Sequence, residues 1–423
     1  MSLALGIDVG TSGVRTAVMD GDELVSMART EHPEQDPDRI DANGWWLAVE
    51  TCMVSQMEAL ESLGVDAKRI SAIAVDGTSG SMVLTDGDVN PASPALMYNS
   101  KGFDAEAEEI AQHAPSNHIA RGSNSALARA LRLVKLSETA PKHLLHQADF
   151  IVAKLMNAGG HSDYNNTLKT GFDPETEQWP DWIGEVIDAD LLPKVHAPGA
   201  ALRQISAEVA AKFGLSEQAI VYAGTTDSIA AFLACASIEE GIAVTSLGST
   251  LAVKLLSAKR IDDPAVGLYS HRLDDLWLVG GASNTGGAVL KQYFAADELD
   301  RLSNQIDPDN PRNLDFYPLL APGERFPVND PGFLPRLEPR PTDDVAFLQA
   351  LLEGMAAIES QCYDAIAQRG GTRPRKVLTA GGGALNETWT AIRAKALNLK
   401  PITSGQSEAA VGVAKLAASG GKR

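Results

Sequence analysis

The 423-residue sequence is poor in several features that mark particular classes of protein. It has only three cysteines, Cys52, Cys235 and Cys362, and their wide spacing matches no zinc-binding pattern. We therefore expect buried thiols in a reducing compartment. The most apolar segment, residues 229–238, is too short to cross a bilayer. No basic stretch followed by a long apolar run opens the chain. The sequence thus predicts a cytoplasmic protein without a membrane partner.

Positive charge is also scarce. Lysine and arginine number 36 against 55 aspartates and glutamates, which gives a formal net charge of -19. This balance argues against a nucleic-acid partner, because such surfaces are basic. The eight histidines show no metal-ligand spacing. No Gly-Lys-Ser/Thr motif occurs, which argues against a P-loop nucleotide site. None of these observations excludes a small phosphorylated ligand, because such a ligand needs only a local binding site.

Length and apolar content predict two domains. Hydrophobic residues make up 44% of the chain and charged residues 22%, as in ordinary globular proteins. A chain of this length exceeds what one core accommodates. We place the boundary between domains 1–222 and 223–423, with the option that the final helix packs back on the first domain. A monomer or a homodimer is expected.

The order of elements indicates an α/β fold. Residues 4–10 and 13–20 read as two strands of a hairpin, residues 44–62 as an amphipathic helix, and residues 70–80 as a strand with its turn. A similar order of strands and glycine-hydroxyl turns begins again near residue 220. Residues 307–341 are rich in proline and predict a long ordered loop, followed by a long helix over residues 345–370.

The first hairpin turn carries a carboxylate and hydroxyls between two strands. Asp8 is followed by Gly10, Thr11 and Ser12. Glycine admits close approach of a ligand to the backbone, and successive N–H groups form an anion nest. Asp8 would repel a phosphate unless a cation such as Mg²⁺ lay between them. An ordinary hairpin turn of the same composition is the alternative.

Two further glycine turns lie in the second half of the chain. Gly248, Ser249 and Thr250 separate two strands and suggest a second phosphate turn. Gly381 and Gly382 follow a strand and precede a helix that contains Asn386 and Trp389. This turn could receive a flat base against bare backbone, with Trp389 as a wall. The alternative is an ordinary strand-to-helix turn with a core tryptophan.

Two further aspartates follow strands. Asp227 lies where a strand ends and a helix begins, so it is either a helix cap or a general base aimed at a substrate hydroxyl. Asp76 is followed by Thr78 and Ser79, whose hydroxyls could contact a polyol. The sequence thus offers Asp76 and Ser79 as candidate substrate-binding residues.

Together these motifs resemble the FGGY carbohydrate kinases of the actin–hexokinase–Hsp70 superfamily. Residues 6–20 and 245–253 are similar to the family's two phosphate motifs, and residues 378–397 to its adenosine motif. Residues 224–234 match the segment with the catalytic aspartate, residues 317–331 a loop peculiar to the family, and residues 408–418 its closing helix. The resemblance spans nearly the whole chain.

The resemblance implies two actin-like, ribonuclease H-like domains around a central cleft, and an ATP-dependent kinase of a small ketose. In this reading Asp8 and Asp227 are catalytic, bind substrate and hold Mg²⁺, and Asp227 takes the proton from the sugar hydroxyl. Thr11 lies near the transferred phosphate. The remaining nucleotide-binding residues are Gly10, Ser12, Gly248, Ser249, Thr250, Gly381, Gly382, Asn386 and Trp389. A non-catalytic ATPase and a sugar sensor are the alternatives from other classes.

Within the family, the chain looks most like the short ribulokinase-like, xylulose kinase-like proteins of cyanobacteria and plant plastids. This similarity implies D-ribulose as the acceptor, with D-xylulose or another pentulose or polyol as the alternative. Two departures occur: Arg129 and Leu131 stand where the family usually has a lysine and a tryptophan. The Gln-Met-His-Gly run of true xylulokinases is replaced by Gly-Thr-Ser-Gly at residues 77–80.

Overall fold

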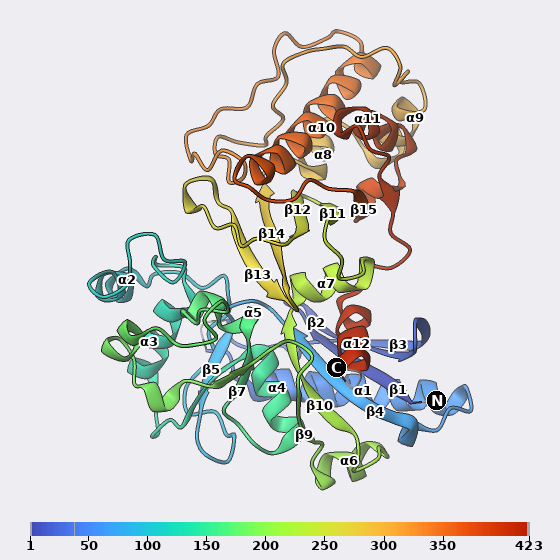
Figure 1. Ribbon diagram of the computed structural model, residues 1–423. Coiled ribbons are helices and arrows are strands. Elements are labelled where there is room, and N and C mark those ends of the chain that lie inside the picture. Colours follow the sequence, from blue (N-terminus) through green and yellow to red (C-terminus); the bar gives the residue numbers. More distant parts are fainter. Residues whose placement is uncertain (1, 38, 421–423) are drawn as a thin grey trace. The chain divides into compact units, whose positions relative to one another are not determined.

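The computed structural model describes residues 2–37 and 39–420, and these divide into two compact units (Figure 1). The first unit holds the chain up to Ala234 together with the segment from Glu408 onward. The second unit is Cys235–Ser407. Among the helices of the described residues, none has the length and apolar character needed to cross a membrane.

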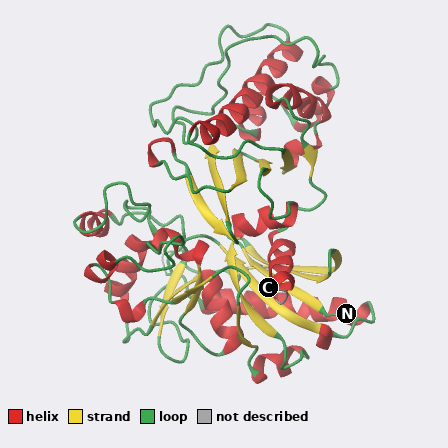
Figure 2. Ribbon diagram, viewed as in Figure 1, coloured by secondary structure: helices red, strands yellow, loops and turns green. Residues whose placement is uncertain are grey.

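The first unit is built on a six-stranded sheet, drawn in yellow in Figure 2. In spatial order its strands are β3 (Glu23–Glu31), β2 (Gly13–Asp20), β1 (Leu3–Val9), β4 (Ile70–Gly77), β10 (Ile220–Thr226) and β9 (Ala201–Gln204). Strands β1, β4 and β10 run parallel, and the outer strands pair antiparallel. The carboxyl ends of the three central strands therefore share one edge, where ligands bind in α/β sheets.

Alternation along β1 separates the two faces of this sheet. Leu3, Leu5, Ile7 and Val9 join one apolar core with residues of α1 (Asn43–Ser62), α4 (Gln147–Met156) and α6 (Ala207–Phe213). Trp45 of α1 meets Phe150 of α4 edge-to-face at 6.2 Å between ring centroids. The opposite face of β1 is covered by α12 (Ala409–Gly420), the last helix of the chain.

Two glycines allow α12 to approach closely. A Cβ atom on Gly6 of β1 would lie 1.9 Å from the carbonyl oxygen of Ala410. A Cβ atom on Gly412 would lie 1.8 Å from the carbonyl oxygen of Ala230 in α7 (Asp227–Cys235). Any larger side chain at these positions would push α12 off β1 and α7, so both glycines are structural requirements.

A smaller region with its own core completes the first unit. Phe103, Leu127, Leu144 and Ile183 are among its buried residues. Its elements are β5 (Met82–Thr85), α2 (Asp104–Ala111), α3 (Ala126–Leu136), β6 (His143–His146), β7 (His161–Asp163), α5 (Tyr164–Thr167), β8 (Lys194–His196) and three short 3₁₀ turns at Leu168–Thr170, Asp181–Glu185 and Ala189–Leu191. A further 3₁₀ turn, Ala67–Arg69, lies between α1 and β4 and packs on the larger core.

The second unit repeats the six-stranded design. Its strands, in spatial order, are β13 (Tyr269–Leu273), β14 (Leu276–Ser283), β12 (Leu251–Ser257), β11 (Ile242–Leu247), β15 (Lys376–Ala380) and β16 (Ile402–Thr403). Its helices are α8 (Gly287–Tyr293), α9 (Ala296–Ser303), α10 (Asp344–Gln368) and α11 (Glu387–Leu397), with 3₁₀ turns at Pro264–Val266 and Gly382–Leu385. As in the first unit, an antiparallel hairpin continues into parallel strands.

Most elements expected from the sequence are confirmed; relative to the expected domains 1–222 and 223–423, the compact units divide later in the chain, and the final helix belongs to the first unit. Residue 222 lies inside β10, which pairs in parallel with β4 and is buried in the first sheet. The chain therefore leaves the first unit only near the end of α7, and it returns at Glu408. Residues 307–341 form a loop without helices or strands, as predicted.

Candidate active site

Three aspartates lie together at the carboxyl edge of the first sheet. Asp8 is in β1, Asp76 is its register partner in β4, and Asp227 follows directly after β10. Asp8 is 4% exposed and Asp76 is fully buried, whereas Asp227 is half-buried. The chain thus gathers carboxyl groups from three parallel strands at one sheet edge, an arrangement that can serve general acid–base or metal chemistry.

Burial and mutual repulsion disturb the ionisation of this cluster. Burial raises the pKa of Asp8, and hydrogen bonding with Asp76 and the charge of Arg15 act in the opposite direction. Burial raises the pKa of Asp76 well above its ordinary value, and the charges of Asp8 and Asp227 raise it further. Two adjacent buried carboxyl groups do not both ionise readily. Asp76 is the one that keeps its proton longer.

The carboxyl oxygens of Asp76 are buried and, apart from the interaction with Asp8, have no hydrogen-bond partner among the described residues. Two ionised carboxylates cannot hydrogen bond to each other, so the hydrogen bond between Asp8 and Asp76 requires one of the two carboxyl groups to be protonated. A buried polar group without a partner is uncommon in native proteins and points to a missing ligand, ion or water. This edge of the sheet is therefore built to receive something polar.

Arg15 partly offsets the negative charge. It lies opposite Asp8 in the β1–β2 hairpin, with Nη1 at 3.3 Å from Oδ2 of Asp8. Its Nε lies 3.5 Å from a carboxylate oxygen of Glu408, just before α12. The sequence analysis did not single out Arg15. Its place directly across the hairpin from Asp8 was the signal that could have found it.

The turn after β1 presents its hydroxyls to solvent. Gly10 N donates to Gly13 O at 2.9 Å and closes the turn, and the side chains of Thr11 and Ser12 are exposed. Nε2 of His32 lies 2.9 Å from the Gly10 carbonyl, which can only accept, so the ring donates. This arrangement leaves Thr11 and Ser12 available to an anion, and His32 is a support that the sequence analysis missed.

Residues 76–81, here called the acceptor turn, comprise the last two residues of β4 and the four residues after it. Thr78 Oγ1 lies 2.6 Å from Ser81 Oγ, and both the Thr78 N–H and hydroxyl donate to Gln147 Oε1. The hydroxyl of Ser79 is buried and has no partner among the described residues. The structure therefore places Ser79 beside Asp76 with its hydrogen-bonding capacity unused.

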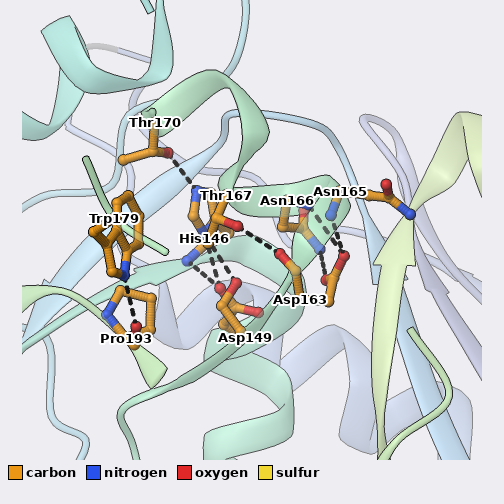
Figure 3. Close-up of polar contacts among 10 residues, drawn as sticks. His146, Asp149, Asp163, Asn165, Asn166, Thr167, Thr170, Trp179 and Pro193 are labelled. Carbon is orange, nitrogen blue, oxygen red and sulfur yellow. Dashed lines mark hydrogen bonds and ion pairs between the residues drawn. The ribbon is translucent and has the colours of Figure 1, made fainter. Parts of the chain in front are cut away.

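Next to β10, buried polar groups of β7 and α5 bond to one another (Figure 3). Asn165 Nδ2 donates to Thr225 Oγ1 at 3.0 Å, and Thr225 is the register partner of Asp76. Asp163 accepts from the backbone N–H groups of Asn165 and Asn166. Burial, followed by the charge of Asp149, raises the pKa of Asp163 to about 7.

In the second unit, two glycine turns meet at the ends of parallel strands. Residues 248–250 join β11 to β12, and residues 381–385 follow β15, the register partner of β11. Gly381 has φ +86°, and a Cβ atom there would lie 2.5 Å from the Leu247 carbonyl oxygen. Gly248, Ser249 and Thr250 are exposed. The predicted nucleotide turns thus lie side by side.

A buried ion pair connects the strands that carry these turns, β11 and β15, to helices α10 and α11. Arg393 of α11 and Glu359 of α10 pair at 2.6 Å and are both almost fully buried. Thr245 of β11 donates to Glu359 at 2.5 Å, and Arg393 also donates to Thr379 of β15. The strands that carry both glycine turns are therefore fixed to α10 and α11.

The structure corrects one predicted nucleotide contact. Trp389 is 2% exposed and belongs to the apolar core of the second unit, so it cannot stack on a base. Asn386 caps α11 through the N–H of Trp389 at 2.8 Å and also donates to Ser303. By contrast, Leu385 beside the turn is 80% exposed. The core alternative for Trp389 is the correct one.

The Gly-Glu-Arg segment at residues 323–325 is anchored by its glutamate. Glu324 is 3% exposed and accepts from Ser283 Oγ at 2.6 Å and Tyr317 OH at 2.8 Å. Arg325 Nε donates to Asn284 Oδ1 at 2.7 Å. The segment is therefore fixed to the end of β14 rather than free to move independently.

The residues of the first unit fit Mg²⁺ that is shared with a ligand. Within the described ranges, no group of three or more His, Cys, Asp or Glu side chains has the geometry to hold a metal ion alone. Mg²⁺ is usually held by one or two carboxylates plus waters and phosphate oxygens. Asp8 and Asp227, beside the buried Asp76, provide such a partial ligand set.

The architecture of two sheets with glycine turns defines the class: the fold is that of the actin-like, sugar kinase/Hsp70 type. A xyloylose kinase from Brucella ovis superposes with a TM-score of 0.87 at 22% identity, covering 99% of this chain and 90% of that one. A gluconate kinase from Lactobacillus acidophilus gives 0.84 at 17% identity, covering 100% and 89%.

The chain belongs to the FGGY family of carbohydrate kinases. The N-terminal domain of that family matches residues 3–234, and its C-terminal domain matches residues 243–420. The xylulose kinase of Bacillus subtilis is 24% identical over 99% of this chain and 88% of its own length. The protein is accordingly a phosphotransferase that acts on a carbohydrate.

Proposed function

We propose that the protein transfers the γ-phosphoryl group of ATP, with Mg²⁺, to a small ketose. The acceptor proposed first is D-ribulose, with D-ribulose 5-phosphate as product. The observation that carries this proposal is the meeting of Asp8, Asp76 and Asp227 at one strand edge, beside a turn with an unpartnered hydroxyl. Membership of a carbohydrate kinase family supports the reaction class.

In this mechanism Asp227 accepts the proton of the sugar hydroxyl as its oxygen forms a bond to the γ-phosphorus. The bond between that phosphorus and the bridging β-phosphate oxygen breaks, and ADP leaves. Asp227 suits this role because it ends a buried strand and stays half-buried, close enough to Asp76 to influence it. The work of such a site is mainly positioning and charge stabilisation.

The exposed turns are proposed to hold the phosphates. In the first unit Thr11 and Ser12 offer exposed hydroxyls and N–H groups, and within the second unit the same kinds of group are offered by Gly248, Ser249 and Thr250; each turn is proposed to bind phosphate. Gly381 and Gly382 leave bare backbone for the adenosine. When bound, Mg²⁺ would neutralise phosphate charge, and Asp8 and Asp227 are the residues that would hold it.

The choice of D-ribulose rests on the small side chains of the acceptor turn. Thr78 and Ser79 stand between Gly77 and Gly80, and the unpartnered hydroxyl of Ser79 is proposed to favour one configuration at a single carbon of the sugar. A buried partner left unpaired costs about 1–3 kcal/mol, which is roughly a tenfold to hundredfold preference. D-xylulose is the second candidate, because curated relatives that span nearly the whole chain are xylulose kinases.

A coupled ADP-release assay across pentuloses, hexuloses and polyols tests both levels of the proposal. We expect sugar-dependent ADP release, with kcat/KM highest for D-ribulose. A preference for D-xylulose, L-ribulose or glycerol would overturn the acceptor and leave the kinase class intact. ADP release that no sugar stimulates would overturn the kinase proposal itself.

A further inference from the structure

The acceptor turn is held on one side by Gln147, the first residue of α4. Its Oε1 accepts from the Thr78 N–H at 3.0 Å and from the Thr78 hydroxyl at 2.7 Å. The backbone N–H of Gln147 donates to the Ser81 carbonyl at 2.9 Å. Gln147 is fully buried, so no water competes for these bonds. One residue thus fixes both ends of the turn.

On the other side the turn is held by Arg129 of α3, which is 3% exposed. Its Nη1 lies 3.4 Å from the Gly80 carbonyl oxygen, and its Nη2 donates to the carbonyls of Tyr98 and Asn124. The N–H of Tyr98 in turn donates to Ser81 Oγ at 2.9 Å. Arg129 therefore joins the turn to two neighbouring loop segments.

Arg129 is an unusual choice for a purely structural contact. Every acceptor that it reaches is a backbone carbonyl, and burial lowers its pKa to about 10, which leaves it charged at neutral pH. Burying a cation without a carboxylate is costly. Arginine can serve three carbonyls from one planar group with fixed geometry, which a lysine cannot.

Arg129 and Gln147, here together called the clamp, fix some polar groups of the turn and do not bond to other polar groups of the turn. The hydroxyls of Thr78 and Ser81 are bonded to each other; Thr78 also donates to Gln147 Oε1, and Ser81 Oγ accepts from the N–H of Tyr98. Apart from the interaction of Asp76 with Asp8, the carboxyl group of Asp76 and the hydroxyl of Ser79 have no hydrogen-bond partner among the described residues. Within the turn, Asp76 and Ser79 are therefore the residues left for a ligand.

We propose that Arg129 and Gln147 are positioning residues that clamp the acceptor turn, so that Asp76 and Ser79 meet the sugar in fixed places. This inference rests on the proposed kinase function. Neither residue touches the reacting atoms. Their loss should weaken recognition of the acceptor while leaving the nucleotide turns of the second unit unaffected.

Steady-state kinetics of Arg129→Met, Arg129→Lys and Gln147→Met, with the best acceptor of the wild type, test the clamp. We expect the acceptor KM to rise at least tenfold in both methionine variants, with the ATP KM within twofold of wild type. Arg129→Lys should fall in between. Arg132→Met is the matched control, since Arg132 lies on the same helix and binds Glu106 at 2.8 Å instead.

Hydrogen–deuterium exchange of the same proteins gives a readout that does not depend on catalysis. The amides of Thr78, Ser81 and Tyr98 should exchange at least tenfold faster in Arg129→Met and Gln147→Met, but not in Arg132→Met. Unchanged exchange at these amides, or equal changes of both KM values, would overturn the clamp. If the wild type phosphorylates no sugar, the proposed function fails, and the exchange experiment still decides whether the clamp exists.

Discussion

Asp227 lies at the junction of β10 and α7. Replacing its carboxylate by the amide of asparagine keeps the size of the side chain and removes its ability to accept a proton. We expect Asp227→Asn to lower kcat by at least ~10²-fold, because the amide cannot accept the proton of the sugar hydroxyl. The acceptor KM should change little, since the amide keeps the size of the carboxylate. Steady-state kinetics at saturating ATP and Mg²⁺ measure both quantities.

The exposed Asp300→Asn in α9 is the control for a change of one charge. Turnover of Asp227→Asn within tenfold of wild type would mean that Asp227 is a helix-start residue and not the base.

Trp389 belongs to the core, so its removal should act on stability. We expect Trp389→Ala to lower the free energy of unfolding of the second unit by roughly 3–5 kcal/mol, as for other large core truncations. The ATP KM of the remaining folded enzyme should stay near that of wild type. Thermal unfolding followed by tryptophan fluorescence, paired with ATP kinetics below the unfolding temperature, checks both points.

A raised ATP KM with unchanged stability would contradict this prediction and restore a base-stacking role for Trp389.

Sequence reasoning could locate Asp8, Asp76 and Asp227, because each ends an apolar strand and parallel strands share an edge. It could not decide which way Trp389 points, since a helix residue faces core or ligand according to packing. Arg129 and Gln147 were missed as supports because their partners are backbone atoms distant in sequence. Such partners leave no local pattern of residue types.

At the scale of elements, the strands and hairpins could be predicted from alternation and glycine turns. The end of the first unit could not, because nothing local tells whether β10 pairs with β4 or begins a new sheet. The closing position of α12 depends in the same way on contacts distant in sequence.

The packing of α12 on α7 can be tested with one methyl group. We expect Gly412→Ala to destabilise the first unit by about 1–3 kcal/mol, because the new Cβ would meet the Ala230 carbonyl oxygen at 1.8 Å. Differential scanning calorimetry measures the loss.

Gly405→Ala is the matched control, since a Cβ atom at Gly405 has no neighbour within 4 Å. Equal transition temperatures for the two variants would show that α12 can shift at no cost.

At the scale of the whole molecule, buried Asp163 should make stability depend on pH. Its pKa is about 7 in the folded protein against 3.8 ordinarily, so the folded state holds a proton that the unfolded state has released. Stability therefore falls as pH rises from about 4 to 7, and the total loss is at most about 4 kcal/mol.

Asp163→Asn removes this ionisation, so the variant's melting temperature should improve relative to wild type as pH rises from 5 to 8. Melting curves at several pH values check the trend, with the exposed Asp190→Asn as control. If the difference in melting temperature between Asp163→Asn and wild type stayed constant from pH 5 to 8, the raised pKa of Asp163 would be contradicted.

The return of the chain to the first unit at Glu408 has a consequence for biosynthesis. The first unit begins with β1, yet β1 lacks the cover of α12 until residues 409–420 have been synthesised. The second unit is complete once Ser407 has been made. Although domains generally fold in order of synthesis, here the unit encoded in the middle of the gene can finish folding before the one that was started first.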